Sequence, residues 1–145
     1  MTATVQIRQA VRLKATPGTI YRALMDSRKH AAFTGAPAKI DPAVGGRFAA
    51  WGPHIQGITV ELIANKRIVQ AWRTQNWPPG HYSIAVFDLK PSKTGTVLVF
   101  TQVGIPARNA KDITEGWKTH YWQPLKKFLE PERPTPRGRL SRGRR

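Results

Sequence analysis

Polar and apolar side chains alternate along residues 5–15, near the start of the chain. Most odd positions there are apolar and most even positions are polar, often arginine or lysine. A period of two with one polar face predicts a half-buried β-strand. Directly after it, Thr16 can cap a helix and Pro17 suits the first helical position. Short helices are therefore expected over residues 17–25 and 26–33.

The middle of the chain has the pattern of a meander of antiparallel strands. Six strands are expected, at residues 39–41, 47–51, 55–63, 67–74, 82–90 and 96–104. Short segments join consecutive strands, and Asn65 is suited to one of the tight turns. The late strands carry apolar residues at both parities, for example Ala85 and Val86. That pattern predicts a sheet covered on both faces, or one whose second face lines an enclosed space.

The chain returns to helical periodicity over residues 112–129. Asp112 is suited to the N-cap, and Glu115 follows at the spacing of a capping box. Pro124 cannot donate to the carbonyl of His120, so a kink is expected there. Strands followed by a helix, without βαβ alternation, indicate an α+β fold. We expect six to seven strands to curve around the long C-terminal helix.

Composition divides the chain into a domain at residues 1–130 and a basic Arg/Pro/Gly tail at 131–145. The formal charge is +16, and the tail contributes +5 through six arginines and one glutamate. Such an imbalance favours attraction to polyanions. Cysteine is absent, and no apolar run approaches the ~20 residues of a membrane span. We therefore expect a protein without a transmembrane segment, located in the cytoplasm, with a tail that is disordered.

Several short motifs, in order, resemble the family of activators of heat-shock protein 90 (Hsp90) ATPase homologues. They are Val44-Gly-Gly-Arg-Phe48, Ile68-Val-Gln-Ala-Trp-Arg73, Gly104-Ile-Pro106 and Gly116-Trp117. Two more, at residues 32–37 and 76–81, resemble the C-terminal domain of the eukaryotic co-chaperone. The resemblance implies a START-like, Bet v 1-like helix-grip fold, in a superfamily of hydrophobic-ligand binders that includes some cyclases and hydrolases. It also implies an Hsp90 chaperone as a partner.

The residues themselves offer little catalytic machinery. Only eight carboxylates are present, and the pair Asp112 and Glu115 is better explained by a helix start than by acid–base catalysis. The four histidines are scattered without zinc-ligand spacing, so no metal and no cofactor is expected. His120 lies at the edge of the helical apolar stripe, where a pH-sensitive or general-base role competes with a simple packing role.

Aromatic side chains are abundant, with five tryptophans in one small domain. They can fill the core, or they can line a groove between helix and sheet. The candidate ligand-binding residues are Phe48, Trp72, Phe87, Trp117, His120 and Tyr121. Trp77, in a proline-rich loop, is expected to plug that loop or to contact a partner.

Four functions remain open on the sequence alone. The first is a non-enzymatic domain that holds a small hydrophobic molecule in the groove. The second is a co-chaperone that stimulates an Hsp90 ATPase, and the third is a cyclase or hydrolase using His120 or Tyr121. The fourth is weak polyanion contact through the tail, whose arginines can neutralise phosphates.

Overall fold

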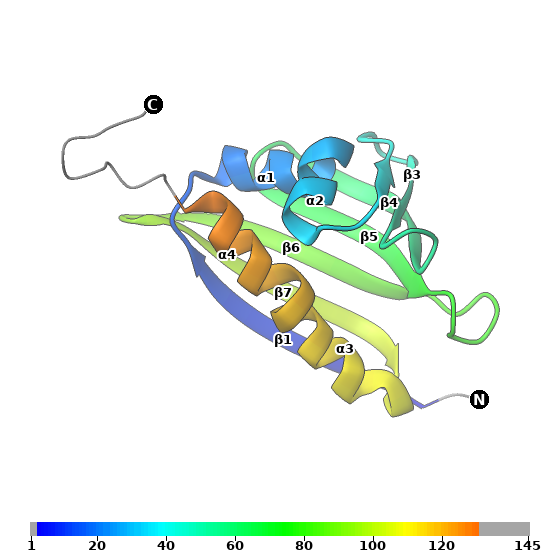
Figure 1. Cartoon of the computed structure of the whole chain (residues 1–145). Helices are drawn as coiled ribbons and strands as arrows, with labels where there is room; N and C mark the ends of the chain where they lie inside the picture. Colours follow the sequence, from blue (N-terminus) through cyan, green and yellow to red (C-terminus); the bar gives the residue numbers. More distant parts are fainter. Residues whose placement is uncertain (1–2, 131–145) are drawn as a thin grey trace.

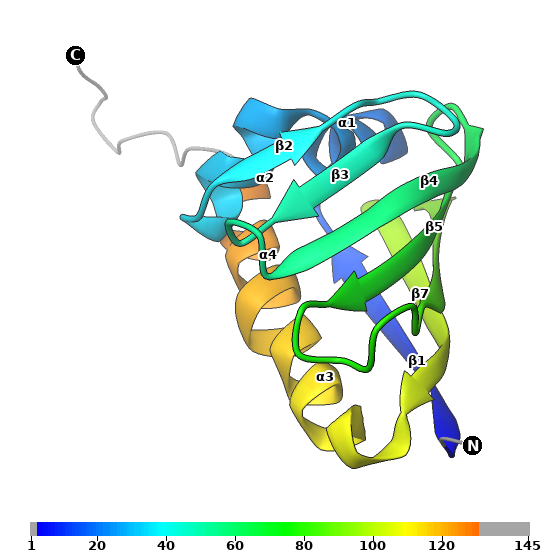
Figure 2. The same cartoon turned by 90° about the vertical axis from the view of Figure 1, so that its right-hand side faces the viewer.

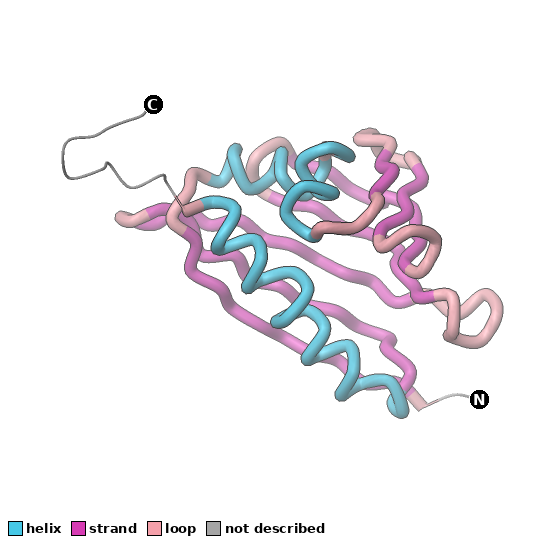
Figure 3. Tube along the Cα trace, in the orientation of Figure 1, coloured by secondary structure: helices cyan, strands magenta, loops and turns pink. Residues whose placement is uncertain are grey.

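A computed structural model describes residues 3–130 and shows a curved antiparallel sheet with all helices on one face (Figures 1 and 3). The strands are β1 (Thr4–Leu13), β2 (Ala38–Ile40), β3 (Arg47–Ala50), β4 (Ile55–Ile63), β5 (Arg67–Thr74), β6 (Ser83–Ser92) and β7 (Gly95–Pro106). Their order across the sheet is β1-β7-β6-β5-β4-β3-β2. The expected α+β helix-grip fold is confirmed.

Two short helices separate β1 from β2, as the capping residues predict. In α1 (Pro17–Met25) the Thr16 side chain accepts a hydrogen bond from the Thr19 N–H at 3.3 Å. In α2 (Ser27–Thr34) the carboxylate of Asp26 accepts from the Lys29 N–H at 2.9 Å. Each side chain satisfies a backbone donor that the helix itself leaves free.

The C-terminal helix lies across the concave face of the sheet (Figure 2). It begins with a 3₁₀ turn, η1 (Ala107–Asn109), and continues through α3 (Ala110–Trp117), the π turn η2 (Lys118–Trp122) and α4 (Gln123–Leu129). Asp112 therefore lies in the first turn and does not cap the helix, contrary to the prediction. The reason is that the 3₁₀ turn brings the helix start forward to Ala110.

Pro124 produces a π turn where the sequence predicts a kink. The Gln123 N–H reaches back five residues to the carbonyl of Lys118, and Pro124 has no N–H to offer. A proline ring also clashes with the carbonyl four residues before it, which is that of His120. Widening the turn to π geometry accommodates the ring without interrupting the helix.

Within residues 3–130 no helix covers the convex face of the sheet, so of the two alternatives the one with both faces covered does not hold for this part of the chain. Ile84 and Val103 lie directly opposite each other on β6 and β7, and they are 42% and 47% exposed. Their inward neighbours Ala85 and Gln102 are fully buried beneath the helices. Among the described residues, no helix has the length and apolarity needed to cross a membrane.

Candidate functional site

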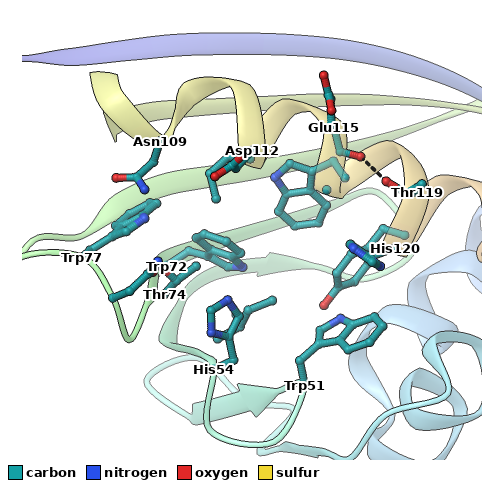
Figure 4. A pocket seen from close by; sticks show the side chains of 16 residues that line it. Trp51, His54, Trp72, Thr74, Trp77, Asn109, Asp112, Glu115, Thr119 and His120 are labelled. Atoms are coloured by element: carbon teal, nitrogen blue, oxygen red, sulfur yellow. Dashed lines mark hydrogen bonds between the residues drawn. The ribbon is translucent and has the colours of Figure 1, made fainter.

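A cavity of about 700 Å³ lies between the C-terminal helix and the loops at one end of β3, β4 and β5 (Figure 4). Its inner wall consists of aromatic rings that are almost fully buried. These are Trp72, Trp77, Trp117 and Tyr121. Its rim consists of exposed polar side chains. These include His54, Asn76, Asp112, Thr119 and His120. The cavity is therefore apolar inside and polar at its mouth.

Trp51 forms the side of the cavity next to the β3–β4 loop. Its φ is 57°, in the left-handed region that a bulky residue rarely adopts, and Gly52 follows with a φ of 64°. This tight turn places the Trp51 ring edge-on to His120, with ring centroids 5.1 Å apart. Backbone conformations of this kind cost free energy and are concentrated at functional sites.

The loop between β5 and β6 places Trp77 at the cavity wall. The Arg73 guanidinium donates to the carbonyls of Trp77 and Pro78, at 2.9 and 3.2 Å, and to that of His81 at 3.3 Å. Held in this way, the Trp77 ring packs on Trp72 with centroids 5.6 Å apart. Trp77 is therefore part of the cavity wall, whereas the sequence favoured a plug of its own loop or a contact with a partner.

A chain of buried hydrogen bonds fixes Trp117 at the centre of the inner wall. Its indole N–H donates to the Gln102 side-chain oxygen at 2.8 Å, and the Gln102 amide donates to the Ser83 hydroxyl at 2.9 Å. Ser83 in turn donates to the backbone carbonyl of Trp72 at 2.8 Å. The chain joins the helix to β7, β6 and β5, so it orients Trp117 and braces the strand that carries Trp72.

Tyr121 is held by a histidine that lies behind the cavity. The Tyr121 hydroxyl lies 3.1 Å from Nε2 of His30 on α2. Burial lowers the pKa of His30 to about 4, and burial also raises the pKa of Tyr121 above its ordinary value. Both groups are therefore neutral near pH 7. A neutral phenol already engaged by His30 favours a structural role for Tyr121 over a role as a catalytic base.

The candidate residues from the sequence fall into two groups. Trp72, Trp117, His120 and Tyr121 line the 700 Å³ cavity. Phe48 and Phe87 do not line this cavity. They border a separate internal void of about 20 Å³ on the far side of Trp72 and Trp117. Their ligand-binding role therefore remains only a sequence prediction, and the geometry places them behind the cavity wall.

Sequence reasoning missed the loop residues that complete the cavity. Trp51 and His54 come from the β3–β4 loop, and Asn109 ends the 3₁₀ turn η1, more than 50 residues further along the chain. The buried indole N–H groups of Trp51 and Trp77 have no hydrogen-bond partner of acceptable geometry among the described residues, and neither does Oδ1 of Asn109. The Asn109 amide can present either its oxygen or its nitrogen. All three are polar atoms buried within residues of the cavity wall.

Metal binding finds no support in the geometry. Within residues 3–130, no group of three His, Cys, Asp or Glu side chains is arranged to hold a metal ion.

Comparison with known proteins gives a family match. The family model described as Activator of Hsp90 ATPase homolog 1-like protein matches residues 14–130. A human relative, "Activator of 90 kDa heat shock protein ATPase homolog 1", is 30% identical over 111 residues, which are 77% of this chain and 33% of the relative. A relative from Dictyostelium discoideum is 29% identical over 126 residues, which are 86% of this chain and 32% of its own. The chain thus spans about a third of the length of these curated relatives.

Solved structures share the fold over nearly the whole domain. An HSP90 activator from Plasmodium falciparum has a TM-score of 0.76 at 22% identity, covering 87% of this chain and 95% of its own. A protein from Chromobacterium violaceum has a TM-score of 0.72 at 27% identity, covering 88% of this chain and 99% of its own.

Proposed function

The chain belongs to the family of Activator of Hsp90 ATPase homolog 1-like proteins, and within that family we propose that its domain works by binding a small, largely apolar molecule. The cavity carries this proposal. Its volume of about 700 Å³ falls within the ~300–1,000 Å³ of small-molecule sites, which are typically aromatic with a few polar groups. Four tryptophans and Tyr121 border it, and polar side chains such as Asn76 and Thr119 lie at its rim.

A filled-cavity variant tests the proposal directly. Thr119 is an exposed residue of the cavity rim, so Thr119→Trp should place a ring in the mouth of the cavity. Lys118 is its exposed neighbour outside the lining, so Lys118→Trp is the matched control. Calorimetric titration with indole, 1-naphthol and a sterol should detect binding that is at least tenfold weaker in Thr119→Trp and unchanged in Lys118→Trp. If no compound binds the unmodified protein at millimolar concentration, the proposal fails.

Action on an Hsp90-type chaperone is the second candidate function. Its support is that the human and Dictyostelium relatives, which match 77% and 86% of this chain, are named as activators of the 90 kDa heat-shock protein ATPase. The domain at residues 1–130 carries 18 basic and seven acidic side chains, a balance that favours an acidic partner surface. Because the chain spans only a third of these relatives, the ATPase effect is proposed and does not follow from family membership.

Steady-state ATPase measurements test this second function. The purified chaperone is assayed with increasing amounts of the full chain, and a chaperone-specific inhibitor defines the background rate. Stimulation that saturates, together with complex formation on a sizing column, is the expected result. An unchanged rate with no complex would contradict it. The Thr119→Trp variant also shows whether the two functions share the cavity, because stimulation that survives this substitution would not depend on an open cavity.

A further inference from the structure

The charged residues that line the cavity are all acidic, although the protein as a whole is strongly basic. Asp112 and Glu115 belong to the lining, and no lysine or arginine does. Basic residues nevertheless outnumber acidic ones more than two to one over residues 1–130. The Glu115 carboxylate is directed away from the cavity in Figure 4, and its carbonyl accepts from Thr119. Asp112 is therefore the carboxylate at the mouth.

The nearby lysine and arginine side chains do not belong to the cavity lining. Arg73 donates to three carbonyls of the β5–β6 loop, and its guanidinium lies 5.8 Å from the ring centroid of Tyr82, which is outside the cavity lining. Lys111 and Lys118 are on the C-terminal helix, but both are exposed and neither is part of the lining. Screening over about 8 Å at physiological salt weakens more distant charges. The lining itself therefore contributes acidic groups and no lysine or arginine.

Those walls present aromatic rings at varied angles to one another. Trp77 and Trp72 meet at 61°, Trp72 and Trp117 at 38°, and Trp51 and His120 at 68°. The face of an aromatic ring carries negative potential, and tryptophan attracts cations more strongly than tyrosine or phenylalanine does. Several rings around one cavity, with a carboxylate at its mouth, form the arrangement that recognises quaternary and protonated amines.

We propose that this cavity selects an organic cation with an apolar surface, such as a quaternary ammonium or a protonated aromatic amine, over neutral and anionic molecules of the same shape. This inference rests on the proposed small-molecule function and specifies the ligand class. An anionic ligand would meet the Asp112 carboxylate and find no lysine or arginine in the lining to offset it. A neutral ligand would gain apolar contact but no attraction to the ring faces.

A pair of isosteric probes separates charge from shape. The cation is (3-hydroxyphenyl)trimethylammonium, and its neutral counterpart is 3-tert-butylphenol, in which carbon replaces the charged nitrogen. Calorimetry at pH 7.5 should show the cation binding about 3- to 30-fold more tightly, as expected for cation–π contacts. The anion 3-hydroxybenzoate should bind more weakly than either. Equal or stronger binding of the neutral phenol overturns the charge preference and leaves the small-molecule function standing. Failure of all three probes counts against both.

Removing the carboxylate at the mouth tests where the preference arises. Asp112→Asn should weaken binding of the cation about 2- to 5-fold, the effect of one partly exposed charge, and leave binding of the phenol unchanged. Glu130→Gln makes the same change in charge at an exposed position outside the lining and should have no effect. Equal losses in the two variants would mean that the charge of the whole molecule sets the preference, and the assignment to this cavity would fall.

Discussion

His30 is a buried titratable group whose ring is in contact with other aromatic side chains. Its ring centroid lies 5.1 Å from that of Phe33 and 5.3 Å from that of Tyr121. Its Nδ1 is buried and has no hydrogen-bond partner among the described residues. An unpartnered buried nitrogen of this kind is costly to charge, which agrees with a pKa of His30 lowered to about 4.

Stability should therefore fall on acidification between pH 6.5 and about 4. In that window the unfolded chain binds a proton at His30 and the folded domain does not, so the free energy of unfolding decreases as the pH falls. Urea unfolding at pH 7 and pH 5 should show that the unmodified protein loses about 2 kcal/mol more than His30→Gln does. Parallel pH profiles for the two proteins would contradict this origin.

Gln102 is a second buried residue whose replacement has a defined cost. Gln102→Leu leaves the Trp117 N–H buried and unpaired, and it also breaks the link to Ser83. The free energy of unfolding should fall by about 2–3 kcal/mol, the usual penalty for an orphaned buried donor. Gln75→Leu, at an exposed position after β5, is the control and should change stability little. If Gln102→Leu unfolds at the same urea concentration as the control, the chain of hydrogen bonds is not stabilising.

The sequence predicted secondary-structure elements but not which side chains pair across them. Alternation and capping residues predict the elements, because both depend on neighbours within a few positions. Trp117 and Gln102, by contrast, meet only through the packing of helix on sheet. Likewise, the choice between Trp72 as a cavity wall and Phe48 as a core residue depends on where the C-terminal helix crosses the sheet.

At the level of the sheet, Gly57 allows the Phe48 ring to pack directly against the β4 backbone. It lies on β4 directly opposite both Phe48 on β3 and Trp72 on β5. A Cβ added at Gly57 would collide with the Ala71 carbonyl and with the Phe48 ring. The Phe48 ring therefore occupies space that any other residue at position 57 would fill.

Gly57→Ala should destabilise the domain by about 2–3 kcal/mol, the upper part of the range for overpacking a close-packed core, because one of the colliding atoms belongs to the backbone. Thermal unfolding provides the measurement. Adding Phe48→Leu should recover only part of the loss, because the collision with the rigid Ala71 backbone remains. Complete recovery in the double variant would show that the ring alone causes the effect.

Replacing Gly116, in the C-terminal helix, by alanine should stabilise the domain, whereas the same change at Gly57 should destabilise it. A methyl group there meets only Cδ2 of His120 at 3.9 Å, an ordinary contact. Gly116→Ala should therefore stabilise the domain by about 0.5–1 kcal/mol through helix propensity. Gly116 also lines the cavity, so the same methyl should weaken binding of larger probes. Thermal unfolding and calorimetry on one sample test both effects, and a loss of stability would contradict the first.

The helix and strand boundaries were largely predictable because local signals agree with the global fold. Thr16, Pro17 and Asp26 mark both early helices, and alternation marks the strands. The start of the C-terminal helix was not predictable from Asp112, because a 3₁₀ turn precedes it. The open convex face was also missed. Exposed Ile84 and Val103 have the same sequence pattern as residues that a second layer would cover.

At the scale of the whole molecule, positive charge is densest in the C-terminal segment, where residues 131–145 contain six arginines and one glutamate. Residues 131–145 lie outside the described residues, so their expected disorder is not tested, and neither is the boundary at residue 130. The contribution of their six arginines to polyanion binding can be measured in solution. Deleting 131–145 should reduce the slope of log affinity against log salt, measured on duplex DNA, by up to about 5. An unchanged slope would place polyanion contact on residues 1–130 instead.

The tryptophans also have an optical consequence. Trp117 lies 5.4 Å from Trp122 and 5.5 Å from Trp72 between ring centroids, and Trp72 lies 5.6 Å from Trp77. Chromophores this close share excitation through exciton coupling and rapid energy transfer, so these four indoles should absorb and emit as one unit. A molecule entering beside Trp77 would then alter light emitted from Trp122, on the other side of the stack. The near-ultraviolet circular dichroism of the domain should accordingly be intense and should respond to events at the cavity as a whole.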